Sequence, residues 1–370
     1  MNPRATADTG TACHGIDDIT LLDALIDGVN VMKHFSRIIH SVSILLIMAI
    51  TVCVLYHTDK LLRPKDMHGM MQAGALYYQP KNTIDVAFMG SSHIYYNVNT
   101  ALLWEKYGMA AYDYGAAEQP LWITYHYLIE LCKYQNPKLI VLDLFGPAEF
   151  KEDYQYTFLR DNLYGMRFSI NKLQMLYASC EPSQYFEYFP GWLDYHDRYR
   201  SLNKADWNYM TSSSKEKASF KGYTPYTNNV ALEEPELTQD LSGDITVKSE
   251  IYLQRIIDYT AEHDIDLFLI VAPYPTNDSH ELVYNRVHEI ADRAGIRFNS
   301  TNYFYDHMDL NFETDFNDLS HLNYAGSCKF TDYLAGEIVR QFDIPDRRGC
   351  DGYESWDQHV TDVQEMVQKE

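Results

Sequence analysis

The sequence predicts an α/β domain built on a parallel sheet with helices on both faces, preceded by one membrane-spanning helix. Two observations predict the sheet: apolar strand-like runs alternate with helical patterns, and runs such as LFLIVA are nearly continuously apolar, as buried parallel strands are. A third, the uncharged apolar run from Ile38 to Tyr56, predicts the span. With 370 residues, 46% of them hydrophobic, the chain is long enough for one large domain, or for a domain with substantial attachments.

The N-terminal part, residues 1–37, divides into two stretches. Residues 1–15 are small, polar and rich in helix breakers, which predicts no fixed structure. From Ile16 to Ser36 the apolar residues follow helical spacing after an acidic first turn. We interpret this stretch either as an amphipathic lead-in to the span or as a helix that lies on the membrane surface or contacts a partner helix.

The span is predicted over residues 38–57, followed by a linker over residues 58–80. Its apolar run contains no Lys, Arg, Asp or Glu and has about the 20 residues that cross a bilayer as a helix. A cleaved signal peptide fits less well because the run begins far from Met1, and a buried soluble helix is the other alternative. The flanking charges do not orient the span, since Lys33 and Arg37 precede it and Lys60, Arg63 and Lys65 follow it.

The domain over residues 81–343 is predicted from alternating elements. Strands are expected at VAFMG from Val86, AAYDYG from Ala110, KLIVLDLF from Lys138, DLFLIVAPYP from Asp266 and IRFNS from Ile296. Helices are expected from Thr100 to Tyr107, Leu121 to Lys133, Ser249 to His263, His280 to Ala294 and Ala325 to Phe342.

Residues 149–247 break the alternation and are interpreted as an insertion. This stretch is rich in Tyr, Phe and Trp, as in YFEYFPGWLDYHDRYR, and its aromatic side chains either line a sugar-binding groove or simply pack. Within it, SSSKEKAS and EEPELTQDLSGD are predicted to be mobile loops. The acidic tail over residues 344–370 is predicted to be loose.

Charge and cysteine content exclude several classes. The chain has 52 acidic and 30 basic residues, a net charge of -22, which argues against a nucleic-acid partner. The six cysteines show no metal-ligand spacing, and we expect neither a metal nor another cofactor. A disulfide between Cys132 and Cys180, or between Cys328 and Cys350, stays open in an exported domain.

Two short motifs indicate nucleophilic catalysis. A serine hydroxyl needs a base to take its proton and a carboxylate to orient that base. Gly90-Ser91-Ser92-His93 follows the first predicted strand, and Asp318 precedes His321 by three residues just before the last helix. In an open parallel sheet both motifs would lie at the carboxyl ends of the strands, where active sites form. Each motif alone is weak, because Gly-Ser also marks turns and Asp-x-x-His also marks caps.

Other acidic and basic residues near these motifs have alternative roles. His93 beside the serine is more simply a turn or packing residue, because adjacent side chains point apart. Asp143 and Glu149 are candidates for the two acids of a glycosidase-like pair. This role is less favoured than a serine nucleophile, because one of the two lies within an apolar strand and the sequence does not give their separation.

The order of the motifs resembles that of the SGNH, or GDSL-like, hydrolase and acyltransferase superfamily. The resemblance covers about residues 81–342 and implies a three-layer α/β/α, flavodoxin-like fold. It implies that Ser92 is the nucleophile, with Ser91 as the fallback, Asp318 the orienting carboxylate and His321 the general base. It also implies that the backbone N–H groups of Ser92 and Gly115 hold the oxyanion.

The family pattern has four sequence blocks, and the third usually contains Gly-x-Asn-Asp, whose Asn is a further oxyanion donor. This third block departs from the pattern here, because Pro147-Ala148-Glu149 stand in its place. The departure resembles a membrane-anchored branch, which includes the D-alanine transfer protein of lipoteichoic acid synthesis and the alginate O-acetylation proteins. This resemblance implies a cytoplasmic N-terminus and a single-pass cell-membrane anchor with an extracytoplasmic catalytic domain.

The implied function is O-acyl, O-acetyl or D-alanyl transfer, or ester hydrolysis, on a cell-envelope or other exported glycan. An acyl donor and a membrane-bound O-acyltransferase are the implied partners. The alternative is a non-catalytic SGNH-like domain that binds a polymer or docks on such a transferase.

Overall fold

The computed structural model describes residues 18–65, 68–237 and 243–369. The chain forms two units, Met1–Lys60 and Leu61–Glu370. The prediction of no fixed structure for residues 1–15 lies outside the described residues, as does part of the EEPELTQDLSGD segment.

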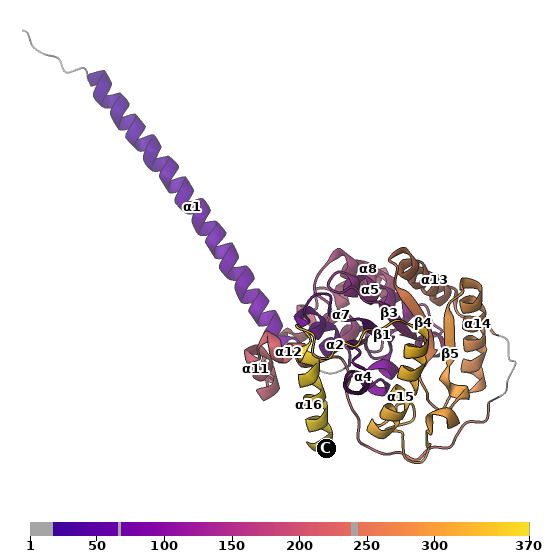
Figure 1. Cartoon of the computed structure of the whole chain (residues 1–370). Coiled ribbons are helices and arrows are strands. Elements are labelled where there is room, and N and C mark those ends of the chain that lie inside the picture. The colour runs from indigo at the N-terminus through magenta and orange to yellow at the C-terminus, as the bar shows by residue number, and fades with distance from the viewer. Residues whose placement is uncertain (1–17, 66–67, 238–242, 370) are drawn as a thin grey trace, which may run out of the picture. The chain divides into compact units, whose positions relative to one another are not determined.

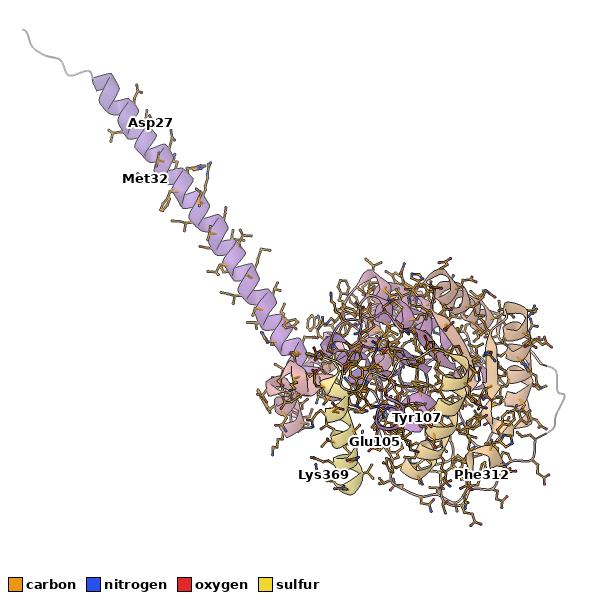
Figure 2. The ribbon with its side chains drawn as sticks, viewed as in Figure 1. Asp27, Met32, Glu105, Tyr107, Phe312 and Lys369 are labelled. Atoms are coloured by element: carbon orange, nitrogen blue, oxygen red, sulfur yellow. The ribbon has the colours of Figure 1, made fainter. Side chains whose placement is uncertain are left out.

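The described residues of the first unit form one helix, α1 (Asp18–Leu62), which ends just inside the second unit. The predicted lead-in helix and the predicted span are therefore continuous. The large apolar side chains from Leu25 to Tyr56 are exposed, and those of residues such as Met32 project away from the helix (Figure 2). The stretch Leu25–Leu62 is long and apolar enough to cross a membrane. Such exposure is unfavourable in water and favourable in lipid, so the helix fits a bilayer.

The second unit is built on a five-stranded parallel sheet with the order β2-β1-β3-β4-β5 (Figure 1). The strands are β1 (Val86–Gly90), β2 (Ala111–Gly115), β3 (Leu139–Asp143), β4 (Asp266–Val271) and β5 (Arg297–Ser300). All five predicted strands are thus present. The strand order reverses between β1 and β3, which makes the carboxyl ends of these two strands the place where an open α/β sheet binds ligands.

The helices of this unit are α2 (Met70–Ala75), α3 (Ser92–Asn97), α4 (Thr100–Tyr107), α5 (Leu121–Cys132), α6 (Phe145–Glu149), α7 (Leu159–Tyr164), α8 (Ile170–Ser179), α9 (Tyr185–Tyr188), α10 (Trp192–Tyr195), α11 (Lys204–Thr211), α12 (Ser214–Ser219), α13 (Val247–Glu262), α14 (Asp278–Ala294), α15 (Tyr324–Gln341) and α16 (Glu354–Lys369). Short 3₁₀ turns are η1 (Leu76–Tyr78), η2 (Pro182–Gln184), η3 (His196–Arg200), η4 (Thr301–Tyr303) and η5 (Asp306–Met308).

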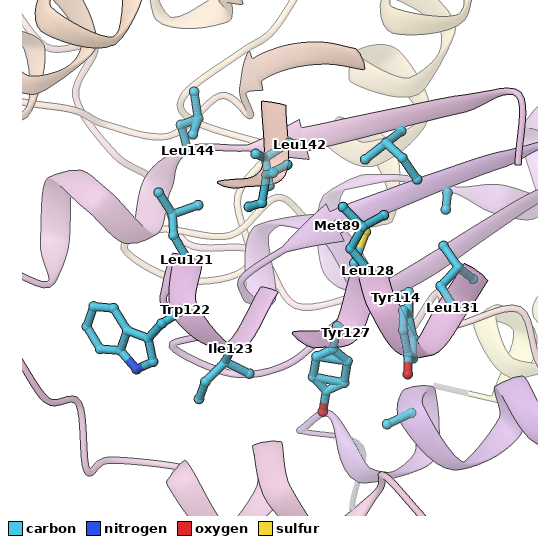
Figure 3. Close-up of a cluster of buried hydrophobic side chains, with 14 of the residues drawn as sticks. Met89, Tyr114, Leu121, Trp122, Ile123, Tyr127, Leu128, Leu131, Leu142 and Leu144 are labelled. Atoms are coloured by element: carbon cyan, nitrogen blue, oxygen red, sulfur yellow. The ribbon is translucent and has the colours of Figure 1, made fainter. Parts of the chain in front are cut away.

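Alternate residues of each strand enter two separate hydrophobic clusters, one on each face of the sheet. Met89 and Leu142 belong to the cluster that contains the apolar side of α5, part of which Figure 3 shows. Phe88 and Val141 belong to the other cluster, together with Phe330 and Leu334 of α15. This division follows from the period of two in a strand, and it explains why β1, β3 and β4 are apolar along nearly their whole length.

Residues 149–247 contribute helices α7 to α12 and, among their described residues, no strand. The prediction of a mobile loop for SSSKEKAS is wrong. Ser213 caps α12 by accepting a hydrogen bond from the backbone N–H of Glu216, whose side chain in turn accepts one from the N–H of Ser213. This reciprocal pair satisfies backbone donors that a helix start would otherwise leave unpaired.

The predicted loose tail is also corrected, because its second half is helix α16. Trp356 is fully buried, and its indole N–H donates a hydrogen bond to the carbonyl of Ala111, 3.3 Å away. His359 Nε2 lies 2.8 Å from Thr100 Oγ1 of α4. An apolar face at helical spacing therefore outweighs the acidic composition.

The cysteines that the structure describes are free thiols, so neither of the two disulfides left open by the sequence is present.

Candidate active site

The turn after β1 places Ser92 at the reversal of strand order. Gly90 has a φ of 145° and lies against β3, where an added Cβ would come within 3.0 Å of the Cβ of Asp143. Only glycine adopts this backbone conformation without strain. Ser91 then caps α3 by accepting a hydrogen bond from the N–H of His93, and Ser92 is the first residue of that helix.

His321 is placed by the turn that follows Asp318. One carboxylate oxygen of Asp318 accepts hydrogen bonds from the backbone N–H groups of Ser320 and His321, both at 2.9 Å. The same carboxylate lies 3.0 Å from His321 Nδ1 through either oxygen. The side chain of Asp318 therefore shapes the turn and orients the imidazole at once.

The second ring nitrogen of His321 reaches the predicted nucleophile. Its Nε2 lies 2.8 Å from Ser92 Oγ. If Nδ1–H donates to Asp318, Nε2 is the acceptor for the Ser92 hydroxyl, which is the arrangement of a serine nucleophile with its base and its orienting carboxylate. The structure thus brings together the three predicted catalytic residues from two segments that are far apart in the chain.

Electrostatics match this arrangement. Partial burial alone would raise the pKa of Asp318, but the hydrogen bond and charge of His321, with further hydrogen bonds from Ser320 and Asn317, hold that pKa well below its ordinary value. The carboxylate is therefore ionised over the physiological range and can accept a hydrogen bond from His321 Nδ1.

Ser91, the fallback nucleophile, has a different neighbour. Its hydroxyl lies 3.5 Å from an oxygen of the buried Asp143 carboxyl group, which also accepts hydrogen bonds from the N–H groups of Ala272 and Phe145. Burial raises the pKa of Asp143 to about 7 in spite of these hydrogen bonds. Asp143 therefore joins the ends of β3 and β4 beneath the turn, and a glycosidase-like role does not suit a side chain occupied in this way.

A cavity of about 560 Å³ opens beside Ser92 and His321. Its aromatic wall is formed by Tyr95, Tyr96, Phe145, Phe150, Phe158, Tyr226 and Tyr274. Its charged and polar wall includes Glu118, Glu149, Gln155, Asn277, His280 and Asp318. A cavity of this size with a few convergent polar groups suits a small acyl group or a sugar-sized acceptor.

Three of the aromatic residues that line this cavity, Phe150, Phe158 and Tyr226, belong to the stretch over residues 149–247, whereas none from its run at positions 185–200 does. A sugar-binding groove formed by that stretch stays a prediction.

Gly115 ends β2 in register with Gly90. A Cβ at this position would lie 2.6 Å from the carbonyl oxygen of Gly90, so the close approach of the two chains requires glycine. Gly115 is not among the residues that line the cavity, whose wall here is formed by Ala117 and Glu118. The role of its N–H in holding an oxyanion stays a prediction.

His280 is a residue of the cavity wall that was not predicted from the sequence, and it contacts Glu149. Glu149, at the end of α6, lies 3.2 Å from Nε2 of His280 through a carboxylate oxygen. Nδ1 of His280 lies 2.7 Å from the hydroxyl of Tyr274. Burial lowers the pKa of His280, opposed by the charge of Glu149. The only sequence signal for His280 was its place just after the carboxyl end of a predicted strand.

His93 is fully buried and packs against Phe145, with ring centroids 4.0 Å apart and ring planes inclined by 33°, so it is a packing residue as predicted. No group of His, Cys, Asp and Glu suited to a metal ion occurs among the described residues.

Comparison with protein-family models and with curated proteins found no match for this chain. The case for its chemistry therefore rests on the geometry just described.

Proposed function

We propose that the chain is a membrane-anchored serine acyltransferase or esterase with an SGNH-like, three-layer catalytic domain. The observation that carries this proposal is the continuous contact from Asp318 through His321 to Ser92, with separations of 3.0 and 2.8 Å. The hydrophobic clusters on both faces of the sheet and the site at its strand-order reversal support the three-layer architecture.

In the proposed reaction, Ser92 Oγ attacks the carbonyl carbon of an acyl ester while its proton passes to His321 Nε2. His321 then gives that proton to the departing alkoxide, which leaves an acyl group on Ser92. In the second half, an acceptor hydroxyl or water gives its proton to His321 and attacks the acyl carbon. The bond from that carbon to Ser92 Oγ then breaks, and His321 returns the proton to Oγ, which restores the serine. The N–H groups of Ser92 and Gly115 are the proposed donors to the oxyanion of each tetrahedral intermediate.

The proposed setting is the outer face of a cell membrane, with residues 1–37 in the cytoplasm. The exposed apolar side chains of α1 support an anchor. The acceptor is a cell-envelope or other exported glycan, and a membrane-bound O-acyltransferase supplies the acyl group from inside the cell.

An activated ester tests the reaction directly. The full chain in detergent micelles, mixed with 4-nitrophenyl acetate, is expected to release a burst of nitrophenol close to one equivalent and to carry an acetyl group on Ser92 after acid quenching. Ser92→Ala abolishes both signals, whereas Ser91→Ala, the matched control, keeps them. A folded wild-type chain with no burst and no acetyl adduct would favour the non-catalytic docking function instead.

A further inference from the structure

The surface of helices α10 and α11 carries exposed aromatic residues that the proposed reaction does not use. Three of the five tryptophans of the chain, at positions 104, 122 and 356, are buried to 2% exposure or less. The other two, Trp192 in α10 and Trp207 in α11, are 50% and 54% exposed. Leu193 and Tyr199, on α10 and η3, are 48% and 58% exposed.

Basic residues accompany these aromatic side chains. Arg200 and Lys204 are exposed on the same short segment, and the guanidinium group of Arg200 lies 5.2 Å from the ring centroid of Tyr199. The nearby Asp194 and Asp206 are already paired, with Arg160 and Arg198 respectively. Asp197 is exposed on the same segment, which therefore carries both signs of charge. Arg200 and Lys204 still place two exposed cations beside Trp and Tyr in a chain with a net charge of -22. We name Trp192, Leu193, Tyr199, Arg200, Lys204 and Trp207 the aromatic-basic patch.

The elements that carry the patch hold the first residues of the second unit. Arg198 Nη1 donates a hydrogen bond of 2.7 Å to the carbonyl oxygen of Leu62. Arg198 also pairs with Asp206, whose carboxylate lies 3.8 Å from Lys65 Nζ. Trp207 follows Asp206 directly, so the patch is tied by these contacts to the point where the chain leaves helix α1.

Chain length places that point close to a bilayer. The apolar run of the span ends at Tyr56, and α1 continues as helix to Leu62. Six residues of helix rise about 9 Å, so Leu62 lies at roughly the depth of the lipid headgroups when the apolar run fills the hydrocarbon core. Trp and Tyr prefer this layer, because their rings are apolar and their polar ends reach water, and Arg and Lys there meet anionic headgroups.

We propose that the aromatic-basic patch rests on the membrane surface, with Trp192 and Trp207 inserted among the lipid headgroups and Arg200 and Lys204 beside anionic ones. The second unit is then held to the bilayer at two places, by the span and by the patch. This inference depends on the span but not on the reaction of Ser92, so either can fail without the other.

Tryptophan fluorescence tests the contact, because every tryptophan lies in the second unit. The full chain is placed in nanodiscs whose anionic lipids are brominated near the headgroup end of the acyl chains, or left unbrominated. We expect bromine to quench part of the emission and the quenching to disappear in the double variant Trp192→Phe, Trp207→Phe. Arg200→Gln with Lys204→Gln is expected to weaken the quenching and to make it insensitive to the anionic lipid content.

A matched control introduces an exposed tryptophan away from the patch. Val247, at the start of α13, is 77% exposed. Val247→Trp in the double-variant background is expected to be quenched by aqueous acrylamide and not by brominated lipid. Equal acrylamide quenching of Trp192, Trp207 and this control in nanodiscs, without bromine quenching, would overturn the proposal. Protection of the patch tryptophans from acrylamide without bromine quenching would also overturn it, because a protein would then cover the patch.

Discussion

Ser91 and Ser92 are adjacent residues with opposite surroundings. The hydroxyl of Ser92 contacts His321 and faces the cavity, whereas that of Ser91 faces the buried carboxyl group of Asp143. The difference arises because the first caps a helix and the second begins it. A shift of one position in the chain therefore decides which of the two serine hydroxyls contacts the candidate base.

The orienting carboxylate is tested by Asp318→Asn. An amide at this position can hold the wrong imidazole tautomer, so we expect the rate constant for reaction of Ser92 with a fluorophosphonate to fall roughly 10³- to 10⁴-fold. Ser320→Ala is the control. It removes a hydroxyl 3.3 Å from His321 Nδ1 but leaves both carboxylate contacts, and its rate constant should change less than about tenfold. Equal losses in the two variants would contradict the orienting role of Asp318.

Asp143 predicts a pH dependence of stability. Burial raises its pKa to about 7 in the folded protein, against about 3.9 in an unfolded chain, so the folded state favours the protonated form. The contribution of Asp143 to the free energy of unfolding is on the order of 4 kcal/mol. It is complete below pH ~4 and is lost as the pH rises through about 7. Asp143→Asn should therefore flatten the fall in melting temperature between pH ~4 and ~7.

The control for this prediction is Asp264→Asn, at an exposed turn with a positive φ that asparagine tolerates. Its melting temperature should follow the wild-type pH profile. If Asp143→Asn follows that profile too, Asp143 is ionised in the folded protein and the assignment of its pKa is wrong.

Helix α16 is the clearest case at the scale of elements. The fully buried Trp356 carries the ammonium group of Lys221 over its ring, 3.5 Å from the centroid. Lys221 is itself buried and donates hydrogen bonds to Gln79, Ala218 and Ser355. Because Ser355 and Trp356 both belong to α16, this helix supplies part of the environment that a buried lysine requires. Burial lowers the pKa of Lys221 well below its ordinary value.

Trp356→Ala removes that cover. We expect it to lower the free energy of unfolding by about 3 to 5 kcal/mol, as the loss of a large buried aromatic residue does. Thermal unfolding in detergent micelles measures the effect. Trp207→Ala, which truncates an exposed tryptophan, should change stability by less than about 0.5 kcal/mol. A small effect of Trp356→Ala would mean that α16 is dispensable for the fold.

The sequence was informative for elements with strong periodicity and for motifs that combine residues close in the chain. All five strands were predicted. The nearly continuous apolar runs of β1, β3 and β4 are typical of parallel strands buried on both faces, whereas β2 contains Asp113 and β5 is only partly buried. The tail helix was missed because its composition is acidic, although Trp356, Val360, Val363 and Val367 follow helical spacing. The contact between Glu149 and His280 could not be predicted, since it joins segments whose proximity depends on the finished fold.

At the scale of the whole molecule, the proposal requires the second unit to lie outside the cell. Cys350 is exposed and free, so a variant that retains only this cysteine should react with a membrane-impermeant maleimide in intact spheroplasts. A variant that retains only Cys13 should react only after the membrane is permeabilised. The reverse pattern would place the candidate active site in the cytoplasm and remove the exported glycan as acceptor.

The central claim is that Ser92 is a nucleophile activated by His321. The most direct measurement treats the full chain in detergent micelles with a fluorophosphonate probe and locates the adduct by mass spectrometry of its peptides. The contact of 2.8 Å between Ser92 Oγ and His321 Nε2 predicts an adduct on Ser92 that is lost in Ser92→Ala and His321→Ala and kept in Ser91→Ala. An adduct on another serine, or none on a folded chain, would contradict the claim.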